Sequence, residues 1–116
     1  MFTVTEVVPF PKDASIPIVA RYHDALSAYN PNAEPGFVSL EGYLAGRLAI
    51  FGLEACGPEL SRRCFIEALH TTGAIDIDGY ELKFGPNDNQ GSDSVFLSVI
   101  GPDGEYRQVK KLAGAN

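Results

Sequence analysis

Side chains that could act on a small molecule stand at the start of one apolar segment. Residues 34–57 read EPGFVSLEGYLAGRLAIFGLEACG, with Ser39 and Glu41 near the beginning of the apolar run. If this segment is a helix, its N-terminus has unpaired N–H groups and about half a positive charge, which suits a ligand carboxylate. Glu41 could then pair with a ligand ammonium or hydroxyl group. A serine cap and a glutamate that complements the helix dipole would explain the same residues, so both interpretations stay open.

Ser39, His70 and Glu41 are also the residue types of a hydrolytic triad. The sequence has no Gly-x-Ser-x-Gly motif, and His70 stands near an expected helix end, where a histidine complements the dipole or lies at the surface. GFVSLEGYLAG lacks the spacing of a phosphate-binding loop, and DNQGSD lacks the final glutamate of a calcium loop. We therefore expect a protein that is not an enzyme.

The cysteines are the other reactive pair. Cys56 ends one expected helix, and Cys64 lies in the first turn of the next, with Gly-Pro between them. This turn could bring their Cα atoms within the roughly 4.4 to 6.8 Å that a disulfide requires. Two buried thiols that pack as small apolar side chains are the alternative. Since His23 and His70 show no ligand spacing, we expect neither a metal site nor a cofactor.

Composition limits the partners and the size of the protein. The 116 residues are enough for one domain at most, and fifteen acidic against nine basic residues give a net charge of −6. The short basic cluster at 107–111 does not make the basic face that nucleic acid requires. No stretch is apolar for long enough to span a membrane, and the first residues do not have the pattern of a signal peptide.

The first elements precede the apolar segment. Residues 3–8 are rich in β-branched side chains and predict a strand, which Pro9 and Pro11 end. A helix is expected next, with Ser15 as its N-cap, Pro17 in its first turn and apolar residues at steps of three and four up to the Asn-Pro that follows.

The remaining pattern predicts two more helices and then strands. After a brief extended stretch at Phe37 and Val38, a helix should run over about 40–55 and end at Gly-Pro. Ser61 should cap a third helix, with Gly73 just past its end. Alternating apolar residues then predict strands near 80–84, 95–100 and 105–109, the last two joined by GPDG. The expected order is one strand, three helices, and two or three strands ending in a β-hairpin.

The middle helix is unusual because it is apolar on most sides and contains glycines. Each of Gly42, Gly46 and Gly52 costs about 1 kcal/mol relative to alanine inside a helix. Glycine would be tolerated where a neighbouring backbone packs closely against the helix. We therefore expect this helix to belong to the interior of a larger assembly.

The order of these segments resembles a known family. VTEVVPFPKDASIPIVARYHDALSAYNPNAEPGFVSLEGYLAGRLAI followed by FGPNDNQGSDSVFLSVIGPDGEY closely resembles the C-terminal part of the periplasmic substrate-binding proteins of branched-chain amino acid type ABC transporters. The resemblance covers residues 3–109 and corresponds to about the last third of a typical member. Many members have a histidine where Asn89 stands, which departs from the commoner pattern.

The resemblance implies an α/β fold, as a fragment of the type I periplasmic-binding fold, in which two lobes close on a small ligand. Residues 1–116 would be a single partial domain, with 15–84 from the first lobe and strands 2–8 and 94–110 from the second. Phe37, Ser39, Leu40 and Glu41 would then be candidate ligand-binding residues at the cleft between the lobes.

The function that this resemblance implies is non-catalytic capture of an amino acid, a small carboxylate or an amide for an ABC-type uptake system. The partners would be the ligand and a membrane permease, and the location would be the periplasm, whose oxidising conditions favour the disulfide. The alternative is a truncated, self-associating module without ligand binding. A homodimer is expected in either case, because the helices lack partners and because the apolar strands at Val4–Val8 and Val95–Ile100 have few neighbours in the chain to pair with.

Overall fold

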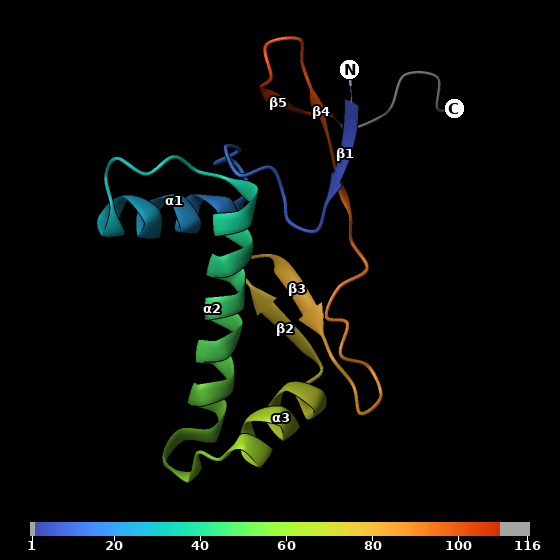
Figure 1. Cartoon of the computed structure of the whole chain (residues 1–116). Coiled ribbons are helices and arrows are strands. Elements are labelled where there is room, and N and C mark those ends of the chain that lie inside the picture. Colours follow the sequence, from blue (N-terminus) through green and yellow to red (C-terminus); the bar gives the residue numbers. More distant parts are fainter. Residues whose placement is uncertain (1, 110–116) are drawn as a thin grey trace.

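The computed structural model describes residues 2–109 and has a mixed α/β fold (Figure 1). This confirms the predicted fold class and most of the predicted elements. In chain order the elements are β1 (Phe2–Glu6), α1 (Pro17–Tyr29), α2 (Phe37–Cys56), the short 3-10 helix η1 (Gly57–Glu59), α3 (Arg62–Thr71), β2 (Ala74–Ile77), β3 (Tyr80–Lys83), β4 (Phe96–Ile100) and β5 (Tyr106–Gln108).

The strands form two separate antiparallel sheets. One has the order β1-β4-β5, and the other is the β2-β3 hairpin. In the first sheet Phe2 pairs with Ile100 and Glu6 with Phe96, so β1 from the start of the chain lies next to β4 from its last quarter. The expectation that β1 and β4 lack neighbours was wrong, because each strand satisfies an edge of the other.

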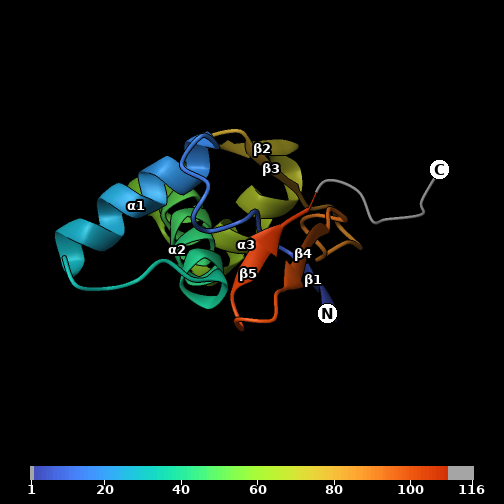
Figure 2. The same cartoon turned by 90° about the horizontal axis from the view of Figure 1, so that it is seen from above.

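Helix α2 is the central element of the molecule. In Figure 1, α1 crosses near the start of α2, α3 lies at its far end, and the β2-β3 hairpin lies beside it. Figure 2 shows the β1-β4-β5 sheet on the other side of the α2 N-terminus from α1. The buried apolar core joins α1, α2 and the hairpin, and its members are Val8, Ile18, Val19, Tyr22, Leu40, Leu44, Ile75 and Ile77.

The molecule is open for its size. Its radius of gyration is 16.5 Å, whereas a compact domain of this length has about 13 Å. One side of α2 remains exposed, with Val38 85% and Ile50 50% accessible. The interior position expected for α2 is therefore only partly reached within this chain.

The glycines of α2 differ in their surroundings. A Cβ atom built at Gly42 or Gly46 would meet no atom within 4 Å, so the expected close contacts at these two positions are not made within the described chain. Gly52 does lie in a close contact, because a Cβ there would be 3.0 Å from Cζ of Phe65 and closer to two other ring atoms.

Two helix starts differ from the prediction. Helix α1 begins at Pro17 with Ile16 as its N-cap, and Ser15 instead donates to the carboxylate of Asp13. Helix α2 begins at Phe37, so this residue is helical rather than extended, and Gly36 is its N-cap. Gly36 has an extended backbone, which ends the preceding loop and starts the helix earlier than the sequence indicated.

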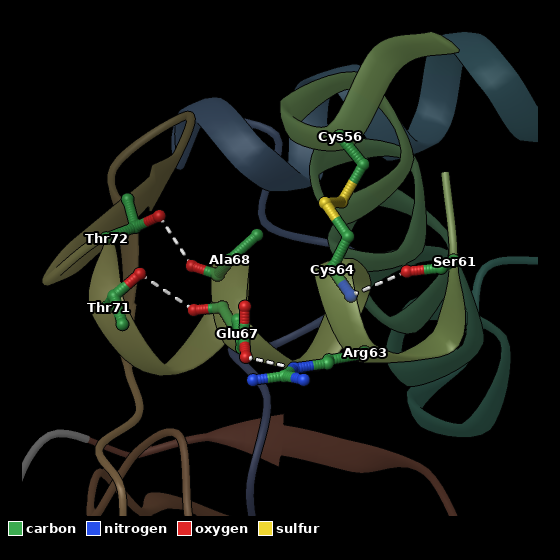
Figure 3. The surroundings of a disulfide bond; sticks show 8 residues. All are labelled: Cys56, Ser61, Arg63, Cys64, Glu67, Ala68, Thr71 and Thr72. Carbon is green, nitrogen blue, oxygen red and sulfur yellow. Dashed lines mark hydrogen bonds and ion pairs between the residues drawn. A yellow bond between two sulfur atoms is a disulfide. The ribbon is translucent and has the colours of Figure 1, made fainter. Parts of the chain in front are cut away.

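The turn between α2 and α3 is held covalently (Figure 3). Cys56 and Cys64 form a disulfide with their Cα atoms 6.0 Å apart. Ser61 is the N-cap of α3 and accepts a hydrogen bond of 3.0 Å from the Cys64 N–H, as predicted. Of the two possibilities that the sequence left open, the structure therefore contains the disulfide.

Candidate ligand-binding cleft

A cleft of about 660 Å³ opens at the N-terminus of α2. One wall comes from the loop before α2 and its first turns, and the other comes from the end of β1, the segment after it and the β4-β5 turn. The residues that line it are Glu6, Phe10, Lys12, Pro35, Gly36, Phe37, Val38, Ser39, Glu41, Glu105 and Tyr106.

Aromatic rings connect these walls. The ring of Phe37 lies edge-on to the ring of Phe10, with centroids 6.0 Å apart, and edge-on to Tyr106, with centroids 5.3 Å apart. Such pairs are more favourable than their buried area alone suggests. Phe37 thus forms an apolar wall of the cleft and also packs α2 against the segments on the opposite side.

The charged side chains of the cleft are mostly acidic. Glu6, Glu41 and Glu105 face a single cation, Lys12, whose Nζ lies 3.9 Å from Glu105 Oε2. Within residues 2–109, Glu41 and Glu6 have no ion pair or hydrogen bond from their side chains. The cleft therefore offers carboxylates to a protonated amine.

The hydroxyl of Tyr22 on α1 forms hydrogen bonds with the first residues of α2. Its hydroxyl accepts a hydrogen bond of 3.0 Å from the Gly36 N–H and shares a short hydrogen bond with Ser39 Oγ, in which either hydroxyl could donate. Ser39 Oγ also lies 3.3 Å from the Gly36 carbonyl oxygen, to which it donates. The interpretation of Ser39 as an N-cap was wrong, because it is the third residue of the helix and Gly36 is the cap.

The four candidate ligand residues do not all lie at the cleft. Phe37, Ser39 and Glu41 line it. Leu40 is fully buried in the core with Leu44, on the same side of the helix because four residues make about one turn. Leu40 therefore packs α2 against the core and is not among the residues that line the cleft.

The sequence did not indicate the cleft residues that come from other segments. Phe10 and Tyr106 were not singled out. The sequence shows that Phe10 stands between two prolines and that Tyr106 follows the GPDG turn. These positions do not indicate which residues the two rings contact. These side chains reach α2 only because β1 and β4 pair and bring their flanking segments together.

A second, smaller cleft adjoins the first. It has a volume of about 220 Å³ and lies between α2 and β3, with Leu44, Leu48 and Tyr80 among its lining residues. Glu41 lines both clefts, so this carboxylate stands at their shared edge.

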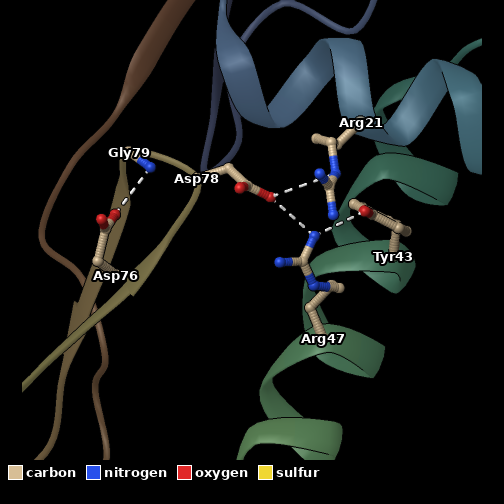
Figure 4. Close-up of polar contacts among 6 residues, drawn as sticks. All are labelled: Arg21, Tyr43, Arg47, Asp76, Asp78 and Gly79. Atoms are coloured by element: carbon tan, nitrogen blue, oxygen red, sulfur yellow. Dashed lines mark hydrogen bonds and ion pairs between the residues drawn. The ribbon is translucent and has the colours of Figure 1, made fainter.

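A polar cluster outside the clefts fixes the hairpin to α2 (Figure 4). Arg47 Nη1 donates to Asp78 Oδ2 at 2.9 Å and to the Tyr43 hydroxyl at 2.8 Å, and Arg21 lies 3.9 Å from the same carboxylate. The hydrogen bond to Tyr43, followed by that to Asp78, raises the pKa of Arg47 above its ordinary value. Asp78 pairs with both arginines, so the cluster links the hairpin turn to α1 and α2.

The residue types of a triad are not brought together. Ser39 and Glu41 are on the first turns of α2, whereas His70 is on the last turn of α3 and its Nε2 is 2.9 Å from Asn89 Oδ1. In the part of the chain that the structure describes, no cluster of three or more His, Cys, Asp or Glu could hold a metal ion. Over the same residues, no helix combines the length and apolarity needed to cross a membrane.

No model of a protein family matches this chain, and the comparison with curated proteins returned no match either. Solved structures do match. One described as a possible leucine/isoleucine/valine-binding protein from Rhodopirellula baltica SH 1 has a TM-score of 0.83 and 38% sequence identity, over 93% of this chain and 29% of that chain.

Two further structures are similar. An extracellular ligand-binding receptor from Verminephrobacter eiseniae ef01-2 has a TM-score of 0.76 and 30% identity over 90% of this chain, which corresponds to 30% of the receptor. A substrate-binding periplasmic protein from Ralstonia solanacearum has a TM-score of 0.77 over 92% of this chain and 31% of its own. With 23% identity, this third likeness shows the fold alone.

The chain thus spans about three tenths of the length of each structure that it matches. The resemblance drawn from the sequence is confirmed: this chain has the fold of a fragment of a type I periplasmic-binding protein, similar in sequence to the leucine/isoleucine/valine-binding kind.

Proposed function

We propose that this chain supplies one part of a solute-binding protein and that its cleft captures a small molecule without transforming it. The observation that carries the proposal is the cleft at the start of α2, where an aromatic wall and an unpaired carboxylate lie next to a helix N-terminus. Two of the similar structures are described as a possible leucine/isoleucine/valine-binding protein and as an extracellular ligand-binding receptor, which supports the same role.

The lining suggests the chemistry of the ligand. A protonated amine would pair with Glu41, and a carboxylate would be favoured at the N-terminus of α2, where N–H groups and the helix dipole point toward it. Phe37 offers a surface for an apolar group between these two. An amino acid has all three features, and a small carboxylate or amide has two of them.

The wider role rests on the family resemblance. We propose delivery of the ligand to the membrane permease of an ABC-type uptake system, with the protein in the periplasm.

Calorimetric titration of the protein with a panel of amino acids, and with small carboxylates and amides, tests the function. Glu41→Ala should weaken binding of the best ligand by about 1 to 3 kcal/mol if the carboxylate pairs with its amine. Glu59→Ala is a matched control, because Glu59 lies on η1 and does not line the cleft. Equal affinities of the two variants would contradict the role of Glu41, and no binding of any panel member would contradict the function of the cleft in this chain.

Self-association is a separate proposal. The exposed apolar side chains on α2, on α3 and in the turn between them, among them Leu53, Leu60 and Ile66, support a homodimer. Sedimentation equilibrium measures it directly: a dimer at micromolar concentration is expected, and a stable monomer would contradict it. If the dimer forms and no ligand binds, the chain acts as a self-associating module.

A further inference from the structure

Exposed apolar side chains lie together at the end of α2 that is far from the cleft (Figure 1). Leu53, Leu60 and Ile66 are each about half exposed, and all three line one groove of about 450 Å³. The complete lining of this groove, here called the α2-α3 groove, is Leu53, Leu60, Ser61, Arg62, Phe65 and Ile66. Single exposed apolar residues are normal on a protein, but a contiguous group of them indicates an interaction surface.

The walls of the groove are held in place before any partner binds. The disulfide between Cys56 and Cys64 joins the end of α2 to the first turn of α3, and Ser61 caps α3 through the Cys64 N–H (Figure 3). The Phe65 ring of α3 packs directly on Gly52 of α2. A surface that is already ordered loses little conformational freedom on binding, which favours association.

The two walls carry opposite charges that have no partner. Arg62 lines the groove on the α3 side, and Glu54 directly follows Leu53 on the α2 side. Within residues 2–109, neither Arg62 nor Glu54 forms an ion pair or a side-chain hydrogen bond, whereas the adjacent Arg63 pairs with Glu67. An apolar centre with a charged rim is the usual arrangement of a protein–protein interface.

A second copy of this chain has the charges that complement these walls. A two-fold interface places the same surface of both copies face to face. If the two-fold axis runs along the groove, the α2 wall of one copy faces the α3 wall of the other, so Arg62 is opposite Glu54 twice. An axis across the groove would instead place like charges opposite each other, which is unfavourable. The charges therefore select one of the two arrangements.

We propose that two copies of this chain associate through the α2-α3 groove, about a two-fold axis along it, with Arg62 of each copy paired with Glu54 of the other. The inference rests on the proposed self-association and names the surface on which it takes place. Because the groove and the cleft lie at opposite ends of α2, this dimer leaves the cleft of each copy open.

Sedimentation equilibrium of Leu60→Asp tests the surface. We expect the unaltered protein to be a dimer at micromolar concentration and Leu60→Asp to be a monomer, because the interface would then bury a carboxylate in its apolar centre. Tyr29→Asp is the matched control, because Tyr29 is also an exposed apolar residue but lies at the end of α1, and this variant should remain a dimer. A dimeric Leu60→Asp would overturn the proposal and leave self-association through another surface, whereas a monomeric unaltered protein would overturn both.

Charge exchange tests the arrangement of the two copies. Arg62→Glu should weaken the dimer by about tenfold or more, because carboxylates would then face each other across the axis. Arg62 is the first residue of α3, where an acidic side chain favours the helix, so this variant should remain folded.

The double variant Glu54→Arg/Arg62→Glu should restore the affinity, because it reverses each pair and leaves the net charge unaltered. Arg63→Glu is the matched control, because it changes the net charge as Arg62→Glu does at a residue that does not line the groove, and it should leave the dimer intact. A double variant as weak as Arg62→Glu would overturn the proposed pairing.

Discussion

Arg47 on α2 and Asp78 in the β2-β3 turn form a close ion pair, with Nη1 and Oδ2 2.9 Å apart and with side chains only 27% and 28% exposed. The pair joins residues that are 31 positions apart in the chain. Because it is partly shielded from water, it should contribute more than an exposed pair.

Arg47→Ala should lower the free energy of unfolding by about 1 to 2 kcal/mol, since it leaves Asp78 without its closest cation. Arg63→Ala is the matched control, because Arg63 also pairs with an acid, Glu67, but its side chain is 88% exposed. Chemical denaturation of both variants measures the difference. Equal losses would mean that the shielding of Arg47 is unimportant.

The contact between Gly52 and Phe65 predicts opposite effects for two identical substitutions. Gly52→Ala should destabilise the protein by about 1 to 3 kcal/mol, because the new methyl group would overlap the Phe65 ring. Gly46→Ala should stabilise it by about 0.5 to 1 kcal/mol, because alanine favours the helix and has free space there. Urea denaturation measures both changes. A destabilised Gly46→Ala variant would show that another surface packs against this position in solution.

The disulfide between Cys56 and Cys64 should be important for the end of α2. Its loop is short, with a sequence separation of 8, so reduction should lower the free energy of unfolding by about 2 to 3 kcal/mol. Denaturation with and without a reducing agent measures this loss, and a Cys56→Ala/Cys64→Ala variant controls for effects of the reagent elsewhere. Identical curves for the oxidised and reduced protein would contradict the prediction.

Asp103 gives the β4-β5 turn a dependence on pH. The Glu105 N–H donates to Asp103 Oδ1 at 3.1 Å and lowers the pKa of that carboxyl below 3.8, and Arg107 acts in the same direction with a bond of 2.7 Å to Oδ2. A lowered pKa in the folded state means that the stabilisation is present above the unfolded value of about 3.9 and is lost as pH falls through the folded value. The turn should therefore loosen in acid.

Nuclear magnetic resonance titration of the Asp103 carboxyl carbon measures this pKa directly. In Asp103→Asn the dependence of the turn signals on acid should disappear. Titration of Asp103 at or above 3.8 in the unaltered protein would show that these hydrogen bonds do not persist in solution.

Local signals in the sequence were sufficient for some elements. Ser61 was recognised as the cap of α3 because a cap acts on an N–H three residues later in the same segment. The GPDG turn was recognised for the same kind of reason, since Gly104 has a positive φ of 80° that glycine readily adopts.

Other elements depend on contacts between distant segments. The start of α2 was missed because Phe37 and Val38 are good strand formers, and Phe37 packs on Phe10 and Tyr106 in the folded protein. Strand β2 was missed although it carries an alternating signal, because Ile75 and Ile77 are buried on either side of the exposed Asp76. Its turn did contain a signal, since Asp78 and Gly79 both have positive φ and the pair Asp-Gly is typical of tight hairpins.

One wall of the candidate site could be predicted from the sequence, and the other wall could not. Glu41 and Ser39 could be predicted from their place near a helix start, and family resemblance gave the direction of the cleft. Leu40 is buried in the core and does not line the cleft, because it lies on the same face of α2 as Leu44. The opposite wall could not be predicted, since it requires the register of β1 on β4.

The two connections between the β1-β4-β5 sheet and the helices have a mechanical consequence. The chain passes between these parts twice, through residues 7–16 and through residues 84–95. Two connections resist twisting of the sheet relative to the helices, but they permit the sheet to bend about the line that joins the two connections. Since the sheet side contributes Glu6 and Tyr106 to the cleft and α2 contributes the facing wall, bending about this line would change the width of the cleft.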